Sequence, residues 1–90
     1  MDLVVSLFDK KTQRPITEKN VHFKRGNKTI RLMDKGGGNY IAMNDVRENF
    51  MLQIQVFGYE GQEVWIDYNQ LSERMPLIRV ELSRRGTWEY

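Results

Sequence analysis

The sequence contains few of the side chains that enzymes use for chemistry. His22 is the only histidine, and the chain has no cysteine, which excludes thiol nucleophiles, thiolate zinc sites and disulfide bonds. A nucleophile needs a base beside it, and no carboxylate stands at a fixed spacing from His22. We therefore expect no catalytic residues, no cofactor and no enzyme activity, and we interpret His22 as a surface or structural residue.

Two further kinds of site come into question, a calcium site built from aspartates and a phosphate-binding loop built from glycines. Asp9, Asp34 and Asp45 would form a calcium site only if their loops converged, and the sequence has no Asp-x-[Asp/Asn]-x-[Asp/Asn]-Gly loop. We interpret them as solvated turn aspartates and expect no metal. The glycine run 36–38 lacks the following helix that a phosphate cradle uses, so it predicts a flexible connection.

Charge is unevenly distributed along the chain. The 14 basic and 12 acidic residues leave a net charge of +2, which is too small for a general attraction to nucleic acid. Basic residues gather in 19–35 and acidic residues in 44–67. The candidate basic patch consists of His22, Lys24, Arg25, Lys28 and Arg31. An oligonucleotide would need exposed rings there for stacking, and Phe23 is expected to face inward, so a solvated face or an acidic protein contact is favoured.

Alternation of apolar and polar residues predicts strands throughout the chain. The pattern is clearest over 50–56 and recurs at 3–7, 21–23, 30–32, 40–43, 64–68 and 78–82. The inward face of 40–43 is not assigned. The dipeptide Gly26-Asn27 predicts a tight hairpin, and 69–76 suits a helical turn that Pro76 would end. The chain is therefore predicted to be all-β, a seven-stranded antiparallel Greek-key sandwich of Ig-like type.

The same alternation predicts which residues fill the core. The inward positions are Leu3, Val5, Leu7, Val21, Phe23, Leu52, Ile54, Val56, Val64, Ile66, Val80 and Leu82. At 90 residues the chain has room for one such core, so we assign 1–83 to a single domain and 84–90 to a C-terminal tail.

Several large apolar residues fall on outward positions and form the candidate protein-contact surface. Met51, Phe57 and Trp65 alternate with the core residues of two strands that the corner 58–61 would make neighbours. Exposed apolar area of this kind marks binding surfaces. The alternative is that the tail, through Trp88 and Tyr90, covers these residues. The sequence leaves both interpretations open.

The order of the turns resembles a known family. Over 4–16 a first strand leads into Asp9-x-x-Thr12-x-x-Pro15-Ile16, Gly38-Asn39-Tyr40 follows, and the strand over 50–56 leads to Gly58-Tyr59. Together these segments, within about residues 3–82, resemble carboxypeptidase-regulatory-like and related transthyretin-like domains. The resemblance implies a prealbumin-like β-sandwich that serves as a non-catalytic module attached to enzymes, receptors or surface proteins.

These observations predict a non-catalytic protein-interaction or structural module, one part of a larger surface or virus-like assembly. The expected partner is another protein or a second copy of the chain. Two alternatives remain: a small transthyretin-type hydrolase, for which a single histidine is too few, and an oligonucleotide binder using the 22–31 hairpin. No apolar run is long enough to span a bilayer, so membrane insertion is not expected, and the sequence indicates no compartment.

Overall fold

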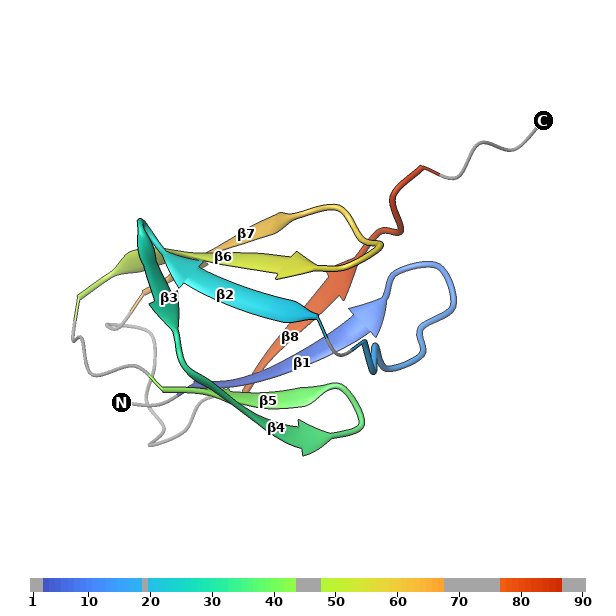
Figure 1. Ribbon diagram of the computed structural model, residues 1–90, viewed down its shortest axis with the longest axis horizontal. Coiled ribbons are helices and arrows are strands. Elements are labelled where there is room, and N and C mark those ends of the chain that lie inside the picture. The colour runs from blue at the N-terminus through green and yellow to red at the C-terminus, as the bar shows by residue number, and fades with distance from the viewer. Residues whose placement is uncertain (1–2, 19, 44–47, 68–76, 87–90) are drawn as a thin grey trace.

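The computed structural model describes residues 3–18, 20–43, 48–67 and 77–86. Two four-stranded sheets face each other (Figure 1). The first sheet has the order β4 (Leu32–Gly36), β5 (Asn39–Ala42), β1 (Leu3–Asp9) and β8 (Leu77–Leu82); the second has β3 (Lys28–Ile30), β2 (Val21–Arg25), β6 (Phe50–Val56) and β7 (Gln62–Ile66). Within these ranges, the prediction of an all-β fold with two sheets is confirmed.

The count of seven strands is wrong, because the expected strand at 30–32 is divided. Ile30 ends β3 in the second sheet, and Leu32 begins β4 in the first. The chain crosses between the sheets at Arg31 (Figure 1), so that Ile30 and Leu32 both contact the core, from opposite layers. The described residues therefore form eight strands.

The expectation of purely antiparallel pairing is also wrong. β1 pairs with β8 in parallel, from Val4 opposite Leu77 to Asp9 opposite Leu82. The other strand pairs are antiparallel. The two strands of a parallel pair end at the same edge of a sheet, so the segments that follow β1 and β8 lie side by side.

The predicted core is confirmed and enlarged. Each predicted core residue is buried, except Val21 and Val64, which are half-buried and pack against the others. The structure adds Ile16, Ile30, Tyr40, Ala42 and Phe50. Tyr40 and Ala42 fix the inward face of β5, and the Tyr40 ring packs 6.1 Å, centre to centre, from that of Phe23 in the opposite sheet.

Two glycine turns connect neighbouring strands. Gly26 has a φ of 61° and Asn27 has no positive φ, the combination of a type II′ hairpin, which confirms the predicted tight turn. The second turn, Gly37-Gly38, connects β4 and β5 where a flexible connection was predicted. Gly38 has a φ of 80°, and its carbonyl accepts the Leu7 amide at 2.9 Å. A Cβ there would lie 2.9 Å from the Leu7 carbonyl oxygen, so the turn packs directly on β1.

Some predictions fall outside the described residues. They are the turn aspartate Asp45, the helical turn at 69–76 and the tail beyond residue 86. Within the described parts of the chain, no helix is long and apolar enough to cross a membrane.

Candidate functional site

The outer face of the second sheet brings together two of the predicted contact residues. Met51 on β6 lies directly opposite Trp65 on β7, and directly opposed residues of an antiparallel pair project from the same face. Met51 is 40% exposed and Trp65 is 56% exposed. The pair therefore presents a tryptophan and a methionine to solvent on neighbouring strands, as the alternation predicted.

Phe57 projects elsewhere. It follows the last residue of β6, at the opposite end of that strand from Met51, and its amide donates to the Asn20 carbonyl at 3.0 Å. Its side chain is 69% exposed and borders a cavity near the end of β1. The structure thus joins Met51 and Trp65 but separates Phe57 from them. Trp88 and Tyr90 lie outside the described residues.

The candidate basic patch is divided between two sides of the second sheet. His22 lies opposite Gln55, and Lys24 opposite Gln53, on the same outer face as the Met51–Trp65 pair. Arg25 has the inward parity of β2, and its guanidinium lies 5.7 Å from the centre of the Phe50 ring.

The rest of the patch follows the β2–β3 turn. Lys28 is opposite Arg25, and Arg31 stands where the chain crosses between the sheets; both are exposed. Phe23, the aromatic ring among these residues, is fully buried. The five residues therefore form no single surface with a ring for base stacking.

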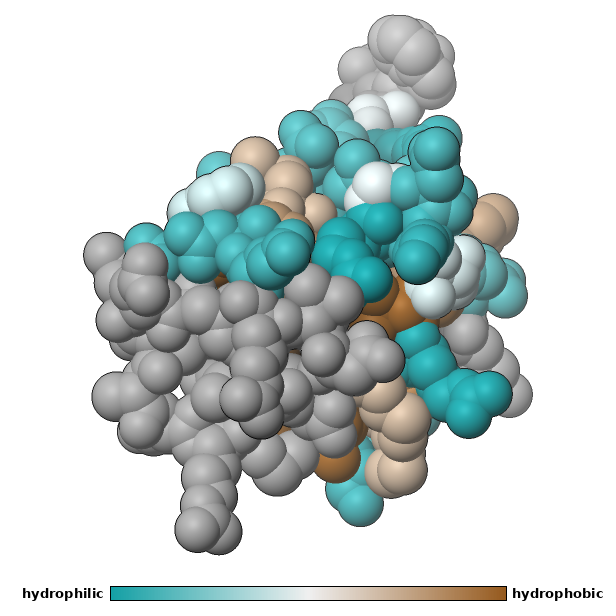
Figure 2. Space-filling view, turned by 90° about the vertical axis from the view of Figure 1, so that its left-hand side faces the viewer, coloured by the Kyte–Doolittle hydropathy of each residue, from teal (hydrophilic) through white to brown (hydrophobic). Residues whose placement is uncertain are grey.

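A second apolar row crosses the outer face of the first sheet, and the sequence analysis missed it. Met33, Ile41, Val4 and Leu77 are successive register partners on β4, β5, β1 and β8. Met33 is 42% and Leu77 is 65% exposed, and the two between them are half-buried. Figure 2 shows one end of the molecule, where hydrophobic residues, in brown, reach the surface at several places among hydrophilic ones.

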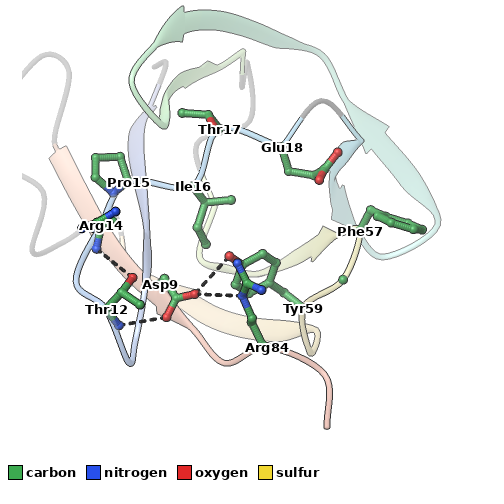
Figure 3. Close-up of a pocket in the computed structure, with 11 residues that line it drawn as sticks. Asp9, Thr12, Arg14, Pro15, Ile16, Thr17, Glu18, Phe57, Tyr59 and Arg84 are labelled. Carbon is green, nitrogen blue, oxygen red and sulfur yellow. Dashed lines mark hydrogen bonds and ion pairs between the residues drawn. The ribbon is translucent and has the colours of Figure 1, made fainter. Parts of the chain in front are cut away.

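Asp9 is buried, contrary to its interpretation as a solvated turn residue. Its Oδ1 accepts the backbone amides of Lys11 at 2.8 Å and Thr12 at 3.1 Å. Its Oδ2 accepts the Tyr59 hydroxyl at 3.1 Å and Arg84 Nε at 3.3 Å (Figure 3). One carboxylate therefore ties together the end of β1, the corner after β6 and the segment after β8.

These donors favour the ionised form of Asp9. The Thr12 amide contributes most to lowering the pKa of Asp9, the Lys11 amide, the Tyr59 hydroxyl and Arg84 lower it further, and burial opposes them. The pKa of Arg84 is raised, first by its hydrogen bond with Tyr59 and then by Asp9. Because its oxygens are occupied and its pKa is low, Asp9 acts as a structural anchor rather than a proton donor at neutral pH.

A cavity of about 440 Å³ lies beside this anchor. Pro15, Ile16 and Phe57 supply apolar walls, and Arg14 and Glu18 supply charged ones (Figure 3). Within the described residues, no group of three side chains that could hold a metal ion is found.

The segments that carry the family resemblance meet at the end of β1. Tyr59 of the Gly-Tyr corner bonds Asp9, and Gly38 bonds Leu7. Ile16, the last residue of the first motif, donates its amide to the Leu7 carbonyl at 2.9 Å. No family model matches the sequence, and no curated protein matches it.

Proposed function

We propose that this chain is a non-catalytic protein-interaction or structural module that binds through the outer face of its second sheet. The observation that carries the proposal is the exposed pair of Met51 and Trp65 on adjacent strands. Tryptophan is enriched among the residues that dominate binding energy, and an apolar centre with polar surroundings is the usual composition of an interface. Gln53, next to Met51 on this face, and Lys24 opposite it supply polar surroundings.

The partner is another protein or a second copy of the chain, within a larger surface or virus-like assembly. Support comes from the other sheet, whose outer face carries the row that ends in Met33 and Leu77. A module with exposed apolar residues on both outer faces suits a position between two neighbours, because each apolar area is covered by a contact.

We also propose that the fold is a Greek-key sandwich of the carboxypeptidase-regulatory-like and transthyretin-like type. Support comes from the direct contacts between its three motif segments, through Asp9, Tyr59 and Gly38. The oligonucleotide alternative has less support, because the basic residues are divided and Phe23 is buried. The hydrolase alternative has less support because His22 lies opposite Gln55, an amide rather than an acid.

Site-specific photocrosslinking tests the proposed surface. A benzophenone amino acid replaces Met51 in one variant and Gln55 in the control; both positions are exposed and project outward from β6. In extracts of the source cells, we expect position 51 to give a discrete adduct, identified by mass spectrometry, and position 55 to give a weaker one. Adducts of equal yield at both positions, or none at position 51, would contradict the proposal.

A further inference from the structure

The parallel pairing of β1 and β8 assembles a basic end that is dispersed in the sequence. Lys10 and Lys11 follow β1, and Arg84 and Arg85 follow β8. The Lys10 amide donates to the Leu82 carbonyl at 2.9 Å, so the two segments stay in contact beyond the strands. The neighbourhood of Asp9 thereby gathers cations from opposite ends of the chain.

The positive charge of this end is only partly neutralised. With Arg14, the end carries five cations, and the described acids on it and on its bordering segments are Asp9, Glu18, Glu60 and Glu81, the last of which pairs with Arg79. Asp9 is already bonded by four donors. The ammonium groups of Lys10 and Lys11 form no ion pair with any residue that the structure describes. Both remain available to a ligand.

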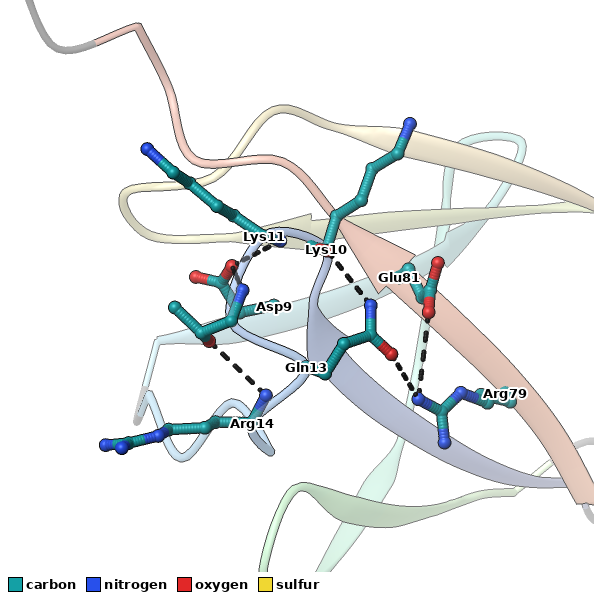
Figure 4. A network of polar contacts seen from close by, with 8 residues as sticks. Asp9, Lys10, Lys11, Gln13, Arg14, Arg79 and Glu81 are labelled. Atoms are coloured by element: carbon teal, nitrogen blue, oxygen red, sulfur yellow. Dashed lines mark hydrogen bonds and ion pairs between the residues drawn. The ribbon is translucent and has the colours of Figure 1, made fainter.

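Three of these cations, Lys10, Lys11 and Arg84, line a cleft between the turn after β1 and the segment after β8. The cleft measures about 690 Å³ and includes Lys10, Lys11, Thr12, Ser83 and Arg84 in its lining. In Figure 4 the side chains of Lys10 and Lys11 leave the turn in diverging directions, so their ammonium groups lie apart. Asp9 contacts Arg84 through Nε, and the Arg84 side chain is 70% exposed, so a terminal guanidinium nitrogen can donate a hydrogen bond to a carboxylate of a ligand.

The cavity that Arg14 and Phe57 border adjoins this cleft at Arg84. Both hollows share Asp9, Thr12 and Arg84 in their linings. A ligand that crosses Arg84 therefore meets lysines on one side, and an arginine with apolar walls on the other. This arrangement suits an extended chain rather than a single small anion.

We propose that this basic end binds an extended acidic segment of a protein, whose carboxylates contact Lys10, Lys11 and Arg84. A single-stranded nucleic acid fits less well, because it needs successive exposed rings for stacking. Phe57 is exposed, but the half-buried Tyr59 is engaged by Asp9 and Arg84. The site lies at the other end of β6 from Met51, so it is separate from the surface of the proposed function.

Fluorescence anisotropy with a labelled deca-glutamate peptide tests the proposal. We expect saturable binding at roughly 20 mM salt that weakens steeply by roughly 300 mM. Changing Lys10→Gln and Lys11→Gln together should weaken binding about tenfold. Neither side-chain ammonium forms an ion pair or a hydrogen bond with a described residue, so the fold should be kept. The control, Lys24→Gln with Lys28→Gln, removes the same charge elsewhere and should change affinity less than about twofold.

Three results would overturn the proposal. The first is the absence of saturable binding to deca-glutamate at low salt. The second is an equal loss of affinity in the two double variants, which would mean that the peptide senses only the overall charge. The third is tighter binding of a labelled oligothymidylate of the same length, which would identify a nucleic-acid site instead.

Discussion

Replacing Ile54 with alanine tests the alternation on which the whole surface assignment depends. Ile54 has no exposed area and stands opposite Phe23 and Gln62 in the middle of the second sheet. The change removes three buried carbon groups at about 0.8 kcal/mol each. The cavity left behind adds a further cost, which brings the expected loss of unfolding free energy to about 2–5 kcal/mol.

Urea denaturation followed by circular dichroism measures this loss, with Met51→Ala as the control on the same strand. Met51 projects outward, so its truncation should cost less than about 1 kcal/mol. A loss below about 0.5 kcal/mol for Ile54→Ala would refute the assigned inward face. A larger loss for Met51→Ala than for Ile54→Ala would indicate that the strand is shifted by one residue.

Three further predictions concern the turn, the anchor and the histidine. Gly38→Ala should cost about 1–3 kcal/mol in urea denaturation, because its Cβ would meet the Leu7 carbonyl oxygen, whereas Gly86→Ala, with open space around it, should be neutral. Because the pKa of Asp9 is lowered in the folded state, its ionised carboxylate stabilises the fold. This contribution is complete above the ordinary aspartate pKa and is lost as the pH falls through the lowered value. Asp9→Asn should therefore reduce the free energy of unfolding at neutral pH and flatten its decline in acid. His22→Ala should leave the thermal midpoint unchanged, since the side chain is exposed.

The local faces of the strands could be predicted from the sequence, because a strand alternates its sides with a period of two residues. The run from Phe50 to Val56 buries every second residue in the structure, and the outward positions of Met51 and Trp65 follow from the same rule. The hairpin at Gly26 was equally local, since its turn chemistry is contained in two residues.

Contacts between distant segments could not be predicted in this way. Alternation says nothing about which sheet a strand joins, so the crossing at Arg31 and the row through Met33 and Leu77 were missed. Two of the four hydrogen bonds of Asp9 could be predicted from the sequence, because Lys11 and Thr12 follow it in its own turn. The other half comes from Tyr59 and Arg84, which reach Asp9 through the folding of remote segments.

The central claim, that the Met51–Trp65 face is a contact surface, is tested most directly with a Trp65→Ser variant. The measurement is the affinity of this variant for the partner captured at position 51, whether that partner is a foreign protein or a second copy. If Trp65 lies in the contact, its removal should cost about 2 kcal/mol or more, which is about a thirtyfold rise in the dissociation constant. A Trp65→Ser variant that matches the parent in stability, in sedimentation and in affinity for that partner would contradict the claim.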